Sequence, residues 1–203
     1  DEAATLAWIG NLACIEIHPW YSRRVHLDYP DYVAFDLDPA EPAGFEEARR
    51  VCFLLKECLD LLGLRGYPKT TGATGIHVYV PLEPIYTYDA VRAFAQGVAG
   101  ALSSAYPGLV TLEREVKKRT GKVYVDYLQL IQGKTLVSVY GVRPRRGAPV
   151  SAPVTWEELE SVLPERFTLK TMPQRLAEVG DLFGPTLTDR QRLPVAPRYE
   201  PRR

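Results

Sequence analysis

Three aspartates of this chain are of the type and spacing that could bind divalent metal ions. Asp36 and Asp38 are two residues apart, and Asp126 lies inside an otherwise apolar run. Carboxylate oxygens are ligands that Mg²⁺ and Mn²⁺ prefer, and both ions also take water and phosphate oxygens. Two such ions about 4 Å apart can stabilise the attacking and departing oxygens of a phosphoryl displacement. We therefore predict a two-metal site on the three carboxylates. The alternative is that Asp36 and Asp38 merely end a strand above a turn.

A glycine-bounded loop, residues 71–75, precedes His77 and could bind phosphate. Its backbone N–H groups and hydroxyls can donate to a triphosphate, and His77 can add a further hydrogen bond. A glycine turn before a strand is also a common structural feature. His18, flanked by Pro19 and Trp20, is another candidate, although a histidine in this setting can equally be a satisfied core or surface residue.

The elements that would position these groups can be predicted from periodicity. Residues 31–38 alternate so that Val33, Phe35 and Leu37 point one way while Asp36 and Asp38 point the other, as strand geometry requires. From Gly44 the apolar spacing becomes helical and ends at Gly63. The order is therefore strand, loop, helix, with both carboxylates on one face.

Further elements follow the same rules. We predict strands at 76–80, 122–128 and 135–140, with a hairpin turn at 132–134 between the last two. Thr87 caps a second helix, Thr155 to Glu158 reads as a capping box, and the tail from Pro185 is expected to be irregular. The fold class is α+β, with mixed or antiparallel sheets and flanking helices. We expect one domain over residues 1–203, with a core at 1–184 and a proline- and arginine-rich tail at 185–203.

Composition narrows the functional classes. Three cysteines form no CxxC pair, which argues against a disulfide framework and fits a reducing cytoplasm. No stretch approaches the ~20 uninterrupted apolar residues that span a bilayer, and the N-terminus lacks the basic start of a signal peptide. The net charge is zero, yet residues 113–146 carry nine basic residues against three acidic ones. That region could be a solvated surface, or it could bind nucleic acid if it lies beside the site.

Four blocks of sequence, in order, resemble the polymerase domain of bacterial and archaeal ligase D, a member of the archaeo-eukaryotic primase superfamily (AEP) that serves non-homologous end joining. The resemblance runs from about Leu6 to about Asp181. The blocks read LAWIGNLACIEIHPW, PDYVAFDLDPAE, YPKTTGATGIHVYVPL and KKRTGKVYVDYLQLIQGKTLVSVYGVRPRRGAPVSAPVTWEEL. The resemblance to this family implies a primase-polymerase catalytic core.

The resemblance also implies roles for matching residues. Asp36, Asp38 and Asp126 match the three metal ligands, for Mn²⁺ or Mg²⁺. The remaining matches are to nucleotide-binding positions: His18 near the sugar, His77 and Thr71 at the phosphates with Gly72 and Thr74 of the same loop, Arg143 at the triphosphate, and Arg119 as a basic residue before the third carboxylate's strand.

Several positions depart from the family pattern. Thr74 stands where the family usually has a phosphate-facing lysine, Leu130 replaces an asparagine and Gly141 replaces a serine. Thr74 removes one positive charge, and the changes at Leu130 and Gly141 are expected to bear on nucleotide affinity or sugar choice and not on the metal site. The resemblance also leads us to expect that the sequence starts after the family's usual N-terminal segment, which grips template and a downstream 5′-phosphate.

The expected function is addition of nucleotides, with ribonucleotides preferred, to DNA 3′ ends during double-strand-break repair. The expected partners are broken DNA, NTP or dNTP, Ku and a separate ligase, with no membrane partner, and the expected location is the cytoplasm at the nucleoid. One alternative is a DNA- or nucleotide-binding remnant or fragment that no longer extends primers. A second is a haloacid-dehalogenase-type phosphatase, which also has Asp-x-Asp after an apolar strand, although Pro39 and Pro185 do not fit its pattern.

Overall fold

A five-stranded sheet forms the centre of the protein in a computed structural model that describes residues 2–194. The strand order is β2-β3-β1-β5-β4, and every pair is antiparallel except β4 with β5. The strands are β1 (Tyr32–Pro39), β2 (Tyr67–Thr70), β3 (Ile76–Pro81), β4 (Val110–Thr111) and β5 (Val123–Asp126). The α+β class with a mixed sheet is confirmed.

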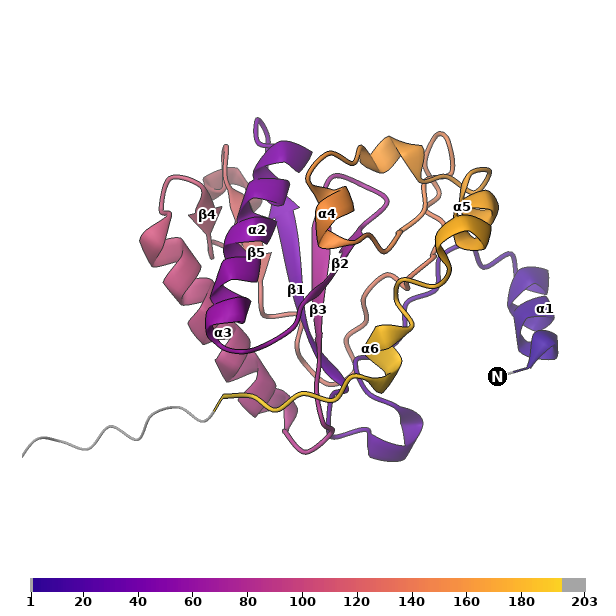
Figure 1. The fold of residues 1–203 in the computed structure, drawn as a ribbon, viewed down its shortest axis with the longest axis horizontal. Helices are drawn as coiled ribbons and strands as arrows, with labels where there is room; N and C mark the ends of the chain where they lie inside the picture. The colour runs from indigo at the N-terminus through magenta and orange to yellow at the C-terminus, as the bar shows by residue number, and fades with distance from the viewer. Residues whose placement is uncertain (1, 195–203) are drawn as a thin grey trace, which may run out of the picture.

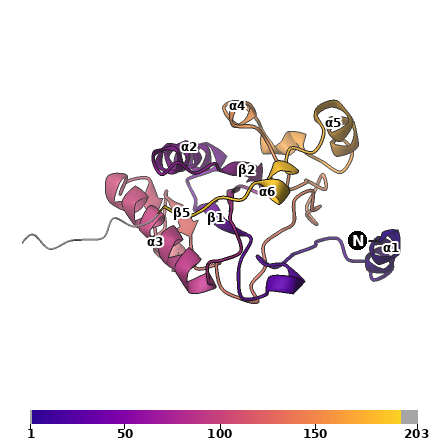
Figure 2. The ribbon, with the colours of Figure 1, turned by 60° about the horizontal axis from the view of Figure 1, so that its bottom comes forward.

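Two long helices cover one face of this sheet, as Figures 1 and 2 show from two directions. They are α2 (Phe45–Leu61) and α3 (Tyr88–Ala105), and their apolar stripes are buried. The remaining helices are α1 (Ala3–Asn11), α4 (Trp156–Leu159), α5 (Met172–Val179) and α6 (Pro185–Thr188), with short 3₁₀ turns at Arg24–His26, Val116–Lys118 and Pro164–Arg166. No helix within residues 2–194 is long and apolar enough to cross a membrane.

Most of the predicted elements are confirmed. The strand at 31–38 is β1, and the helix after Gly44 is α2. The Thr87 hydroxyl accepts a hydrogen bond from the Ala90 N–H at 3.3 Å, as an N-cap residue should. Both hydrogen bonds of the capping box at Thr155 and Glu158 are formed at the start of α4. Local signals were sufficient for these elements because each is set by neighbouring residues.

The predicted hairpin of strands 122–128 and 135–140 is wrong. Only Val123–Asp126 is a strand, and residues 135–140 do not pair with it. Instead, the Leu136 N–H donates to the Pro19 carbonyl at 3.3 Å and the Ser138 N–H donates to the Ile17 carbonyl at 2.8 Å. The alternating pattern at 135–140 therefore serves a long-range pairing with the segment that carries His18, and turn signals cannot predict such a partner.

The tail from Pro185 is also more regular than predicted. Its first residues form α6, and Gln191 is buried. The Gln191 side-chain amide donates to the Arg65 carbonyl at 3.0 Å, and the Arg65 N–H donates to the Gln191 Oε1 at 2.7 Å. These bonds attach the segment to the body of the protein. Residues 195–203 lie outside the described residues.

Candidate functional site

A row of four polar side chains crosses the face of the sheet opposite α2 and α3. Lys69 of β2 is paired with His77 of β3, His77 with Asp36 of β1, and Asp36 with Asp126 of β5. Directly opposed residues on adjacent strands have Cβ atoms about 5 Å apart. The strand register therefore places two of the predicted carboxylates and the predicted histidine side by side.

The carboxylate of Asp36 is buried and lacks its full complement of partners. Its Oδ1 has no hydrogen bond within residues 2–194, although His77 Nε2 lies 3.2 Å away. Burial raises the pKa of Asp36 to about 6, against the opposing effect of Lys69 and two arginines. Burial, with Asp36 nearby, likewise raises the pKa of Asp38 to about 6. Two carboxylates in such surroundings favour binding of a cation.

Asp126 is held in place by its own strand. Its Oδ1 accepts a hydrogen bond from the Tyr124 hydroxyl at 3.1 Å and another from the Leu128 N–H at 2.9 Å. Tyr124 is opposite Asp38 in the sheet, and the guanidinium of Arg119 lies 3.7 Å from the centre of its ring. Arg119 thus lies close to the third carboxylate, but it does not line the cleft described next.

A cleft of about 280 Å³ opens over the middle of this row, at Asp36 and His77. Seven of the predicted residues line it, and Asp126, Gly72 and Arg119 do not. The lining residues are His18, Asp36, Asp38, Thr71, Ala73, Thr74, His77, Thr135, Leu136, Val137, Arg143 and Arg145. The strands therefore supply the carboxylates and His77, and three loops supply the remaining walls.

The glycine loop is folded around its own threonine. The Thr71 hydroxyl accepts hydrogen bonds from the Ala73 N–H at 3.1 Å and the Gly75 N–H at 3.3 Å. Two of the amides expected to face a phosphate are therefore already engaged within the loop. Gly72 has φ +70°, and a Cβ there would lie 2.7 Å from Arg143 Cγ, so glycine allows Arg143 to cross the loop closely.

Arg143 and His18 are joined by an acidic residue that the sequence analysis missed. Glu16 forms an ion pair with Arg143 Nε, and its Oε2 lies 3.3 Å from His18 Nε2. Arg143 also donates to the Thr71 carbonyl at 3.5 Å. The sequence offered one indication of this contact: Glu16 and His18 are two residues apart, so in an extended segment their side chains lie on the same face.

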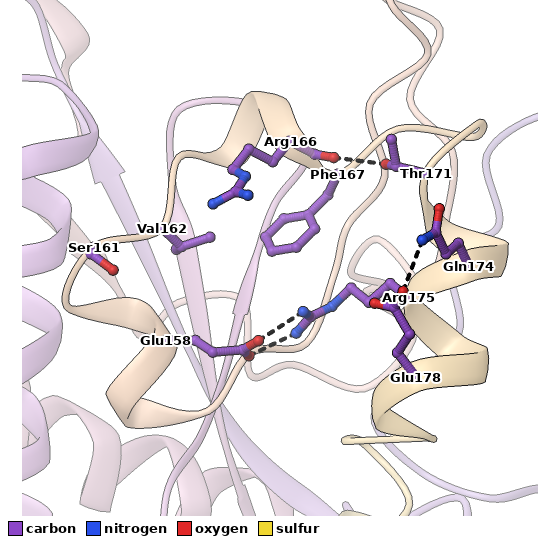
Figure 3. Close-up of a pocket in the computed structure, with 9 residues that line it drawn as sticks. All are labelled: Glu158, Ser161, Val162, Arg166, Phe167, Thr171, Gln174, Arg175 and Glu178. Atoms are coloured by element: carbon purple, nitrogen blue, oxygen red, sulfur yellow. Dashed lines mark hydrogen bonds and ion pairs between the residues drawn. The ribbon is translucent and has the colours of Figure 1, made fainter.

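Larger cavities lie elsewhere. One cavity has a volume of about 390 Å³ and is lined by residues of α4 and α5. Figure 3 shows two of these residues, Glu158 and Arg175, pointing toward one another. Arg175 donates to both carboxylate oxygens of Glu158, at 2.7 and 2.6 Å, and Gln174 donates to Glu178 at 2.8 Å. Because these groups satisfy one another, we place the site at the smaller cleft over the polar row.

The donor atoms present fit a hard divalent cation. Residues 2–194 contain no ready-made cluster of three metal-ligating side chains, so a cation held by all three of Asp36, Asp38 and Asp126 would require these side chains to move closer together. The unpartnered Oδ1 of Asp36 supports the fit, because a buried carboxylate oxygen without a partner is costly. The all-oxygen donor set favours Mg²⁺ or Mn²⁺ over softer metals.

Gly75 is expected to be required for the close approach of β3 to β1. An added Cβ would lie 2.7 Å from the Leu37 carbonyl oxygen and 3.4 Å from Asp38 Oδ1. Gly75→Ala should therefore lower the free energy of unfolding by about 1–3 kcal/mol in urea titrations, since backbone must shift. Gly97→Ala is the matched control, because α3 leaves open space there and alanine should stabilise by about 0.5–1 kcal/mol. Equal stability of the two variants would contradict the close contact.

Comparison with known proteins agrees with this geometry. A family model described as LigD, primase-polymerase domain, matches residues 1–183. The chain is 36% identical over 185 residues to the bifunctional non-homologous end joining protein LigD of Bacillus subtilis, covering 90% of this chain and 30% of that protein. It is 36% identical over 201 residues to the multifunctional non-homologous end joining protein LigD of Pseudomonas aeruginosa, covering 98% of this chain and 24% of that protein.

A solved structure is similar over nearly the whole chain. It is the polymerase domain from Mycobacterium tuberculosis ligase D in complex with DNA, with a TM-score of 0.82 and 30% identity. The match covers 94% of this chain and 69% of that one. The chain thus spans less than a third of the two curated relatives and about two thirds of the solved domain.

Proposed function

Because the chain belongs to the LigD primase-polymerase domain family, we propose that it is a nucleotidyltransferase that adds nucleotides to DNA 3′ ends in repair by non-homologous end joining. The observation that carries the proposal is the cross-strand row of His77, Asp36 and Asp126 beneath a cleft that Arg143 also lines. Family membership leaves no support for the phosphatase alternative.

The carboxylates would hold the metal ions in this proposal. Asp36, Asp38 and Asp126 would bind Mn²⁺ or Mg²⁺, which when bound supplies charge neutralisation at the reacting phosphate. The protein's own contribution is alignment of the two substrates and a fixed electrostatic environment. No covalent intermediate with a side chain is required.

The cleft residues would bind the nucleotide. Arg143 and His77 would donate to the triphosphate, with the hydroxyls of Thr71 and Thr74 from the loop that contains Gly72. His18 would contact the sugar, and Glu16 would hold the imidazole and Arg143 in register. Arg119, stacked on Tyr124, would add positive charge beside Asp126. Burial lowers the pKa of His77 well below its usual value, so it would act as a neutral hydrogen-bond donor.

The substrates and partners are part of the same proposal. The similar mycobacterial domain was solved in complex with DNA, which supports a DNA 3′ end as one substrate. We propose NTP in preference to dNTP as the other, with Ku and a separate ligase as partners at breaks in cytoplasmic, nucleoid DNA. Residues 1–203 would act as one domain, and the hydrogen bonds of Gln191 to Arg65 favour a core that continues beyond residue 184.

The test is extension of a labelled primer–template by the purified chain. With Mn²⁺ and each NTP or dNTP in turn, we expect primer extension that disappears when a chelator removes the metal and returns when Mn²⁺ is restored. Faster extension with NTP would support the ribonucleotide preference. Nucleotide and DNA binding without any extension would instead identify a non-extending binding module.

A further inference from the structure

Lys69 is a fully buried lysine at the end of the polar row, and the proposed chemistry does not use it. Its side chain is 0% exposed, and its direct neighbour in the sheet is His77. No carboxylate of residues 2–194 forms an ion pair with it. Burial lowers the pKa of Lys69 to about 7, while the Asp36 carboxylate acts in the opposite direction. An apolar side chain of similar length would avoid the desolvation cost, so stability alone does not account for a lysine here.

The ammonium group connects three separate segments. Lys69 Nζ donates to the Val137 carbonyl at 3.0 Å and to the Ser151 hydroxyl at 2.5 Å. The Ser151 hydroxyl in turn donates to the Thr70 carbonyl at 2.8 Å. The Tyr79 ring lies beneath the ammonium, 5.7 Å from its centre. Within residues 2–194, the hydrogen bonds and the ring contact of Lys69 are all with neutral groups.

One of the anchored segments forms part of the wall of the cleft that Asp36 and Asp38 also line. Val137 lines the cleft together with Thr135 and Leu136, and we call residues 135–137 the outer wall. Leu136 and Val137 are buried, and among the hydrogen bonds of residues 2–194 the outer wall is otherwise attached through the Leu136 N–H bond to Pro19 and the Thr135–Trp20 bridge. It belongs to no strand of the sheet, so Lys69 is its direct connection to β2.

Ser151 extends the same connection to Arg143. The Ser151 N–H donates to the Gly141 carbonyl at 2.9 Å, and the Tyr140 N–H donates to the Ser151 carbonyl at 2.8 Å. These bonds fix residues 140–143, which we call the Arg143 arm and from which the Arg143 side chain reaches the cleft. Lys69 of β2 thus binds the outer wall directly and the Arg143 arm through Ser151.

We propose that Lys69 is a positioning residue for the nucleotide, which fixes the outer wall and the Arg143 arm to the edge of the sheet next to His77. This inference rests on the proposed nucleotidyl transfer. Removing the ammonium would leave the carboxylates in place and loosen the opposite side of the cleft. The nucleotide should then bind more weakly, while the chemical step of bound nucleotide changes little.

Three variants test this role by separating KM from kcat. Lys69→Met removes both hydrogen bonds and should raise the KM for NTP and the Kd for Mn²⁺–ATP about tenfold, as expected for loss of charge-assisted bonds that position a ligand, with kcat within about threefold of wild type. Ser151→Ala keeps the lysine and removes one acceptor, so the same constants should rise about threefold. Lys69→Arg retains the charge and the donors and should recover part of the loss. Lys170→Met, at an exposed lysine, is the control and should change neither constant.

The outcomes are distinguishable. A purely structural role would lower the amount of folded protein, and hence kcat, with KM and Kd unchanged, and that result would overturn the proposal. If Lys69→Met does not fold, an unchanged Kd in Ser151→Ala would overturn it equally. Extension by the wild-type chain tests the proposed function separately: a chain that binds Mn²⁺–ATP without extending primers refutes that function, yet the Kd series still decides the role of Lys69. A wild-type chain that binds no nucleotide would overturn both.

Discussion

Replacing Asp36 with asparagine is expected to lower the kcat of primer extension at least about a thousandfold. Asp36 is central to the polar row, where it is opposite Asp126 on one side and His77 on the other. Asparagine has nearly the same shape but presents one oxygen and no charge. The variant would therefore weaken metal binding and charge neutralisation while the packing around β1 is preserved. The measurement is single-turnover extension with Mn²⁺, together with Mn²⁺ binding followed by electron paramagnetic resonance.

The loss should not come from unfolding. Burial raises the pKa of Asp36 from 3.8 to about 6. Without metal, the free energy of unfolding should therefore fall as the pH rises from about 3.8 to about 6, because the ionised carboxylate is disfavoured in the folded state. In chelator at pH 8 the asparagine variant should therefore be at least as stable as wild type in urea. Asp60→Asn, on the exposed side of α2, should leave both extension and metal binding unchanged. Full primer extension by the Asp36→Asn variant would contradict the role of Asp36 as a metal ligand.

The sequence was sufficient to predict the part of the site that depends on local periodicity. Alternation in residues 31–38 placed Asp36 and Asp38 on one face, and β1 has that arrangement. The placement of Asp126 on a strand next to β1 is also confirmed by their pairing. These predictions depended on strand geometry and on the cost of an aspartate within an apolar run, both of which are properties of short segments.

The parts that escaped prediction are those created by pairing between distant segments. Lys69 directly precedes the turn-rich loop, and only the register of β2 against β3 places it beside His77. Glu16 acquires its role only because residues 135–138 pair with 17–20 and so bring Arg143 to it. The same pairing removed the predicted hairpin. Register and long-range partners are set by the whole fold, so a single sequence does not specify them.

Replacing Arg143 with alanine is expected to raise the KM for NTP about 10–100-fold, the second largest effect that the site predicts. Arg143 lines the cleft, is paired with Glu16 and donates to the Thr71 carbonyl at 3.5 Å. In the alanine variant the triphosphate loses a guanidinium partner, and it also meets the Glu16 carboxylate without its countercharge. Repulsion therefore adds to the lost hydrogen bonds.

A cycle of variants can separate the two causes of the rise in KM, which are the lost hydrogen bonds and the repulsion from Glu16. Arg143→Lys keeps the charge opposite Glu16 but not the planar fork, so its KM should lie between those of wild type and alanine. Adding Glu16→Gln to the alanine variant should recover the part of KM that is due to repulsion, and the remainder measures the lost donors. Arg50→Ala, at an exposed arginine of α2, should leave KM unchanged. Burial raises the pKa of Asp36 and the charge of Arg143 lowers it, so Mn²⁺ binding without nucleotide should match wild type in Arg143→Lys and Arg50→Ala, which keep the charge of Arg143. A fall in kcat at unchanged KM would mean that Arg143 acts on the chemical step and not on nucleotide binding.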